Sequence, residues 1–129
     1  MSYRILVIDD SPLARGTVRD ILTAADYDVV EAVDGQDGLD KARQCQPHLI
    51  LLDMILPKLD GQQVFQALQA SRTTKSTPVI FLAAGSEARL QSLAAKAGAF
   101  AGVAKPVEPK VLLDIVAAAL DQRRTAGRG

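Results

Sequence analysis

The chain has 129 residues, which suits one domain and leaves little room for a second. Lys and Arg (15 together) balance Asp and Glu (also 15), so nucleic-acid binding driven by bulk positive charge is not expected. The single cysteine, Cys45, cannot form an internal disulfide. There is no signal-peptide pattern and no apolar run of membrane length, so we expect a cytoplasmic protein without membrane partners.

Five short apolar runs alternate with amphipathic stretches along the chain. Each run is a predicted strand, and the runs cover residues 3–8, 28–32, 48–52, 79–82 and 100–104. The first, third and fourth are nearly continuous in Ile, Leu and Val, which is typical of strands covered on both faces. The alternation predicts a (βα)5 α/β sandwich of three layers, with a parallel sheet in the order 2-1-3-4-5.

The helices are predicted between and after these strands. Ser11 followed by Pro12 indicates the start of the first helix, on which Leu13 and Val18 should face the core. Further helices are expected over residues 35–45, after 60–61, up to a C-terminal glycine at 98, and over about 111–120. We expect a domain over residues 1–122 and a disordered basic tail over 123–129.

Acidic residues follow two of the predicted strands, and a lysine ends another. Asp9 and Asp10 follow the first strand, Asp53 the third, and Lys105 the fifth. In a sheet of this order the three carboxylates converge at one crevice. Two carboxylates about 4 Å apart repel by roughly 4 kcal/mol at an effective dielectric constant near 20, so the group needs a cation or a shared proton. All-oxygen ligands of this kind favour Mg²⁺.

This arrangement suits phosphoryl transfer. Asp53 stands alone at the end of the central strand and is the natural nucleophile, because a carboxylate can form an acyl phosphate. Asp9 and Asp10 would hold the metal, and Lys105 would pair with a phosphoryl oxygen. A single Asp after a strand is usually a helix cap or turn residue, but three Asp and one Lys at three strand ends exceed that expectation.

Several short motifs resemble a known family when they are taken together and in order. They are Ile8-Asp9-Asp10-Ser11, the stretch from Leu52 to Gly61, Pro78-Val79-Ile80, Gly98-Ala99 and Lys105-Pro106. Over residues 3 to 122 the chain resembles the receiver domain of two-component response regulators, of the stand-alone chemotaxis-regulator type with a flavodoxin-like fold.

The resemblance implies a signalling switch that only phosphorylates and dephosphorylates itself. A sensor histidine kinase or a phosphotransfer protein would donate the phosphoryl group to Asp53. Mg²⁺ would be held by Asp10, Asp53 and the backbone carbonyl of Ile55, with Asp9 acting partly through water, and Lys105 would contact the phosphoryl group. The Lys105-Pro106 bond is expected to be cis.

The resemblance also implies how such a protein would signal. We expect a protein target and no nucleic-acid partner, and a monomer or a weak homodimer formed through helix four, strand five and helix five.

Two residues depart from the family pattern. Ala83 stands where the family has Thr or Ser, and Gly102 stands where it has Tyr or Phe. The hydroxyl that contacts the phosphoryl group and the aromatic ring that responds to it are both missing, so the switch is expected to be atypical. Phe100 has the parity of residue 102 and should point the same way, as part of the core.

Two alternatives stay open from the sequence. A pseudo-receiver would bind partners regardless of phosphorylation; Ala83 and Gly102 favour it, and the intact Asp9, Asp10, Asp53 and Lys105 oppose it. A flavodoxin-like cofactor enzyme would need a phosphate-binding loop after the first strand, where this chain places two aspartates.

Overall fold

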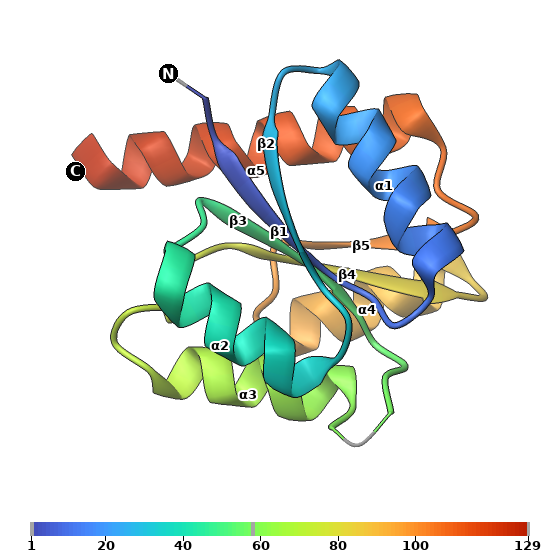
Figure 1. The fold of residues 1–129 in the computed structure, drawn as a ribbon, viewed down its shortest axis with the longest axis horizontal. Coiled ribbons are helices and arrows are strands. Elements are labelled where there is room, and N and C mark those ends of the chain that lie inside the picture. The colour runs from blue at the N-terminus through green and yellow to red at the C-terminus, as the bar shows by residue number, and fades with distance from the viewer. Residues whose placement is uncertain (1, 58, 129) are drawn as a thin grey trace.

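The computed structural model describes residues 2–57 and 59–128, with side chains as far as residue 121. Five strands alternate with five helices in these residues (Figure 1). The strands are β1 (Arg4–Ile8), β2 (Asp28–Ala32), β3 (Leu49–Asp53), β4 (Val79–Ala84) and β5 (Ala101–Lys105). The helices are α1 (Pro12–Ala24), α2 (Gly35–Cys45), α3 (Gly61–Ala70), α4 (Glu87–Ala97) and α5 (Pro109–Arg128).

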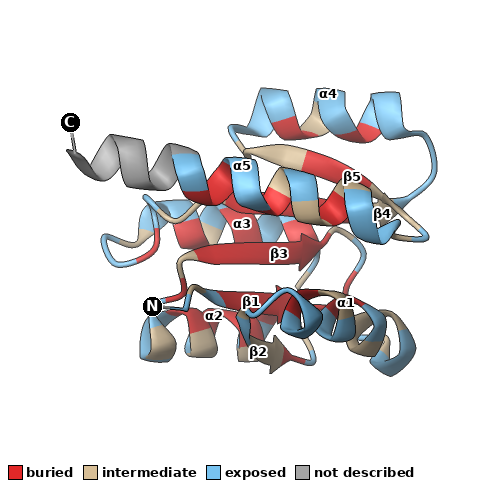
Figure 2. Ribbon diagram, turned by 90° about the horizontal axis from the view of Figure 1, so that it is seen from above, coloured by how far each residue is buried: buried red, intermediate tan, exposed pale blue. Residues whose placement is uncertain are grey.

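The strands form one parallel sheet in the order β2-β1-β3-β4-β5, which confirms the predicted topology. Strand β3 lies in the middle of the sheet, and every one of its residues is buried (Figure 2). Its continuous apolar sequence follows from this position, because helices cover both faces of the sheet. The central strand therefore carries Asp53, its last residue, to the carboxyl edge of the sheet.

Alternate strand residues feed two separate cores. On one face Ile8, Leu52 and Phe81 pack with apolar residues of α2, α3 and α4. On the other face Val7 and Leu51 pack with apolar residues of α1 and α5. The fold is thus the predicted three-layer sandwich.

Capping side chains and a glycine define three of the helix ends, and those at Ser11 and Gly98 confirm the prediction. The Ser11 hydroxyl accepts a hydrogen bond from the Ala14 N–H, with Pro12 in the first turn. Asp60 forms a reciprocal capping box with Gln63 at the start of α3. Gly98 ends α4 with φ of 90°, a left-handed conformation that favours glycine.

Two predicted side-chain orientations were wrong. Leu13 is 83% exposed, because it lies in the first turn of α1, which begins directly after the loop that leaves the sheet edge. Phe100 packs against the core on the α1 and α5 face, opposite the face to which Gly102 contributes. Strand β5 begins at Ala101, so the two-residue alternation of the strand does not extend back to Phe100.

Two predictions concern the ends of the chain and its location. The predicted disordered tail, residues 123–129, overlaps the last turns of α5, where the structure describes no side chains, so its disorder stays a prediction. Among the described residues, no helix combines the length and the apolar character needed to cross a membrane.

Candidate functional site

Three of the predicted site residues meet at the carboxyl edge of the sheet. Asp9 follows β1, Asp53 ends β3 and Lys105 ends β5. The ammonium of Lys105 donates to Oδ2 of Asp9 at 2.8 Å and to Oδ2 of Asp53 at 3.1 Å. Strand β4 lies between β5 and β3, so the long lysine side chain spans the end of β4 to reach both carboxylates.

Asp10 completes an acidic cluster at this edge. One carboxylate oxygen from each of Asp9, Asp10 and Asp53 lies within 4.8 Å of the other two. Asp9 and Asp53 are buried and Asp10 is exposed, so the cluster opens to solvent on the Asp10 side. Three anionic oxygen donors with one open side fit a hard cation such as Mg²⁺, which keeps part of its water shell.

Burial and the neighbouring charges shift the pKa values of two of these groups. Burial raises the pKa of Asp53 and the charge of Asp9 adds to the rise, while the Ile55 N–H and Lys105 offset only part of it. Burial alone would lower the pKa of Lys105, but its hydrogen bonds to Asp9 and Asp53 outweigh burial and raise it. Lys105 therefore stays charged, and the Asp53 carboxylate is held in a site that disfavours its charge.

The predicted role of the Ile55 backbone carbonyl in holding Mg²⁺ stays a prediction, and the structure shows a different contact of this residue. Its N–H donates to Oδ1 of Asp53 at 3.1 Å, which orients the carboxylate. Its side chain is 74% exposed. The Lys105-Pro106 bond is cis, as predicted.

The loop after β1 uses its own donors internally. The Ser11 N–H donates to Oδ1 of Asp9 at 2.9 Å, and the Ala14 N–H donates to the Ser11 hydroxyl. These backbone groups are the ones a phosphate-binding loop would turn toward a cofactor. The loop therefore gives no support to the cofactor-enzyme alternative.

The two departures from the family pattern lie on β4 and β5. Ala83 is half-buried against the α2, α3 and α4 core, and it pairs in register with Ala104. Gly102 pairs with Phe81 and lies directly under α4. A Cβ atom on Gly102 would lie 2.6 Å from Cγ of Leu90 and 2.9 Å from the Leu90 carbonyl oxygen, so helix backbone occupies the space of a side chain.

A side chain from α4 also accepts a hydrogen bond from the backbone of β5. The Gly102 N–H donates to the side-chain oxygen of Gln91 at 3.1 Å, which satisfies a donor on the open edge of the sheet. Neither Leu90 nor Gln91 was predicted as a neighbour of residue 102. A glycine inside a predicted strand, which often marks close backbone approach, was the available signal.

Comparison with known proteins identifies the family. The model of the response regulator receiver domain matches residues 5–117. The chain is 41% identical over 122 residues to the DNA-binding dual master transcriptional regulator RpaA of Synechocystis, covering 95% of this chain and 50% of RpaA. It is 32% identical over 117 residues to Protein PilH of Pseudomonas aeruginosa, covering 91% of this chain and 97% of PilH.

A solved structure agrees with these relatives. The chemotaxis response regulator CheY4 of Vibrio cholerae superposes with a TM-score of 0.84 at 27% identity, covering 92% of this chain and 99% of CheY4. The chain therefore belongs to the response regulator receiver family of two-component signalling. Members of this family bind Mg²⁺ at an acidic pocket, interact with histidine kinases or phosphotransfer proteins, and are generally not enzymes.

The relatives differ in length. The chain spans about half of RpaA and 58% of the similar Protein PilG of Pseudomonas aeruginosa, but nearly all of PilH. The family match concerns the receiver unit, which is the part that these relatives share with this chain.

Proposed function

We propose that the chain accepts a phosphoryl group on Asp53 from a phosphohistidine of a histidine kinase or a phosphotransfer protein. The observation that carries this proposal is the Lys105 ammonium, which lies between Asp9 and Asp53 at the edge where three carboxylates meet. A cation and an acidic cluster that opens to solvent, beside the Asp53 carboxylate as nucleophile, are the parts that phosphoryl transfer requires.

In the transfer, an Asp53 oxygen forms a bond to phosphorus while the bond between phosphorus and the donor imidazole nitrogen breaks. The nitrogen keeps the electron pair and takes up a proton, and the product is an acyl phosphate. The Ile55 N–H orients the Asp53 carboxylate, and Lys105 is close enough to balance charge on the phosphoryl oxygens. Attack by water on the phosphorus would return the carboxylate and free phosphate.

The metal belongs to the same proposal. Asp10 and Asp53 would hold Mg²⁺ with the backbone carbonyl of Ile55, and Asp9 would contribute partly through water. Bound there, Mg²⁺ would neutralise charge on the transferred group. The exposure of Asp10 supports this assignment, because it leaves the cluster accessible to a hydrated ion.

The switch is proposed to be weak. Ala83 has no hydroxyl to donate to a phosphoryl group, and Gly102 leaves no room for a ring between β5 and α4. A hydrogen bond to a charged group contributes about 1.5–3 kcal/mol, as much as a typical allosteric coupling of about 1–3 kcal/mol. Loss of the hydroxyl would therefore remove most of the coupling while leaving the acceptor intact. We expect signalling by contact with a protein target in the cytoplasm.

A pseudo-receiver is the second candidate, and the packing of Gly102 favours it. With α4 fixed on β5, a partner could bind that face whatever the state of Asp53. The buried Asp9 and Asp53 oppose it, because two neighbouring buried carboxylates are costly to keep without a use.

Mass spectrometry distinguishes the two candidates. Incubation with Mg²⁺ and acetyl phosphate should give a phosphoryl adduct that Asp53→Asn abolishes. Asp60→Asn is the matched control, because Asp60 lies in the following loop and Asn keeps its helix cap. If no adduct forms with acetyl phosphate or with any phosphohistidine donor tried, the pseudo-receiver is favoured.

A further inference from the structure

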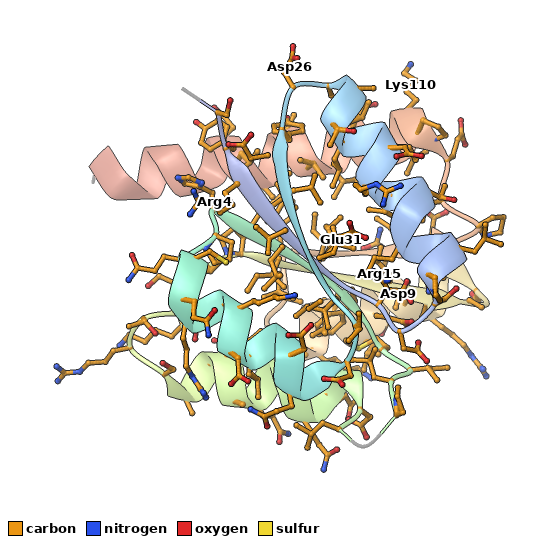
Figure 3. The ribbon with its side chains drawn as sticks, viewed as in Figure 1. Arg4, Asp9, Arg15, Asp26, Glu31 and Lys110 are labelled. Carbon is orange, nitrogen blue, oxygen red and sulfur yellow. The ribbon has the colours of Figure 1, made fainter. Side chains whose placement is uncertain are left out.

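Arg15 connects the acidic cluster to strand β2. Its Nη1 donates to the backbone carbonyl of Asp9 at 2.8 Å, and its Nε donates to Glu31 at 3.0 Å. The side chain is only 14% exposed, although it carries a full charge. Figure 3 shows Arg15 on α1, and its two hydrogen bonds place it between Glu31 on β2 and Asp9.

The carbonyl that Arg15 holds belongs to the peptide between the two neighbouring aspartates. The Asp9 N–H donates to the Ala32 carbonyl at 3.2 Å, and its carboxylate is held by the Ser11 N–H and Lys105. The Asp9 carbonyl is the remaining polar group of this buried residue. By binding it, Arg15 fixes the plane of the peptide from which Asp10 departs.

We infer that Arg15 is a positioning residue for the acidic cluster, which acts through the Asp9–Asp10 peptide to set the cluster's affinity for Mg²⁺. The inference rests on the proposed function, in which this cluster holds the ion. Groups that orient metal ligands from outside typically change metal affinity by about 10–100-fold when they are altered.

Glu31 has a distinct part in this arrangement. An unbalanced guanidinium beside a cation site would repel the ion. Glu31 offsets that charge and holds the second edge of the planar fork, so that Nη1 stays directed at the Asp9 carbonyl. Arg15 can therefore position the peptide without opposing Mg²⁺.

The chain offers a matched control for this role. Arg19 also pairs with Glu31, at 3.4 Å from Nη1, but among the described residues it has no hydrogen bond or ion pair to Asp9, and its side chain is 44% exposed. If the pairing with Glu31 were all that mattered, changes at Arg15 and Arg19 would affect the cluster alike.

Isothermal titration of the full chain with Mg²⁺ tests the inference. Arg15→Lys keeps the charge but loses the planar fork that directs Nε at Glu31 and Nη1 at the Asp9 carbonyl, so we expect about tenfold weaker Mg²⁺ binding at an unchanged melting temperature. Arg19→Lys should stay within about twofold of the wild type. The amide resonances of Asp10 and Ser11 should shift in Arg15→Lys and not in Arg19→Lys. Wild-type affinity in folded Arg15→Lys overturns the inference.

A second variant keeps the test open if Arg15→Lys does not fold. Glu31→Ala frees the other edge of the Arg15 fork, so Mg²⁺ binding should weaken severalfold and stay weak in about 0.5 M salt. A purely electrostatic effect would be screened at that salt concentration, so a loss that vanishes there overturns the inference. If the wild type itself fails to bind Mg²⁺, the proposed function fails and this inference fails with it.

Discussion

At the scale of single residues, Lys105 has two opposite effects at the acidic cluster: it neutralises the carboxylates and it repels a cation bound to them. Its ammonium is the counter-ion of Asp9 and Asp53, and it lies where it would also repel a divalent cation. Lys105→Gln should therefore bind Mg²⁺ severalfold more tightly than the wild type. The same variant should no longer form the phosphoryl adduct. Titration calorimetry and mass spectrometry measure the two effects, with the exposed Lys96→Gln as control. Weaker Mg²⁺ binding would contradict this description of Lys105.

Asp53 makes the stability of the domain depend on pH. Its pKa is raised above the ordinary value of 3.8, chiefly by burial, so the folded state holds the proton more tightly than the unfolded chain. Stability should fall as pH rises from about 3.8 through the raised pKa, and the loss should be complete above it.

The neutral variant Asp53→Asn should escape this loss. Without Mg²⁺ it should melt at a higher temperature than the wild type at pH 7, and the gap should close as pH falls below about 3.8. The exposed Asp20→Asn serves as control and should show no such gap. If Asp53→Asn melted at a lower temperature than the wild type at pH 7, the raised pKa would be refuted.

At the scale of the elements, helix α4 is fixed on β5 by contacts with Gly102. Gly102→Ala would place a Cβ atom against the Leu90 side chain and also against the Leu90 backbone carbonyl. It should therefore destabilise the fold by about 1–3 kcal/mol. Gly16→Ala is the matched control in α1, where a Cβ atom meets only the Arg19 side chain at 3.5 Å or more. That change should stabilise by about 0.5–1 kcal/mol. Urea denaturation measures both, and a neutral Gly102→Ala would mean that α4 is not held tightly.

The sequence predicted the elements well where a local pattern defines them. Caps such as Ser11 and Gly98 and the apolar runs of the central strands are local signals, and the structure confirms them. The orientations of Leu13 and Phe100 were wrong because each lies at the end of an element, where periodicity no longer describes the environment. The position of α4 over Gly102 depends on how a helix settles on a sheet, which no local pattern contains.

At the scale of the whole molecule, the site depends on the order of the strands. Asp9, Asp53 and Lys105 are far apart in sequence, and the predicted order 2-1-3-4-5 was enough to bring them to one edge. The double contact of Lys105 and the hold of Arg15 on the Asp9 carbonyl were not predictable. Both depend on the reach of long side chains between elements, which the strand order does not specify.

The molecule as a whole thus combines a cluster of three carboxylates with a tight contact between α4 and β5. The cluster lies at the carboxyl edge, and α4 with β5 lies at one side of the sheet (Figure 1). With the weak switch proposed above, we expect a phosphoryl group on Asp53 to change the loops around the cluster and to leave the contact between α4 and β5 in place. A target that senses phosphorylation would then have to contact those loops.

An amide NMR spectrum with Mg²⁺ and beryllofluoride, a phosphoryl mimic, shows directly whether α4 stays in place on β5 when the site at Asp53 is occupied. We expect large shifts for the amides of Asp10 and Ile55, which adjoin the cluster, and small shifts for Gln91 and Gly102. Comparable shifts at Gln91 and Gly102 would contradict a contact between α4 and β5 that stays in place. A spectrum unchanged at every residue would contradict the assignment of Asp53 as the phosphoryl acceptor.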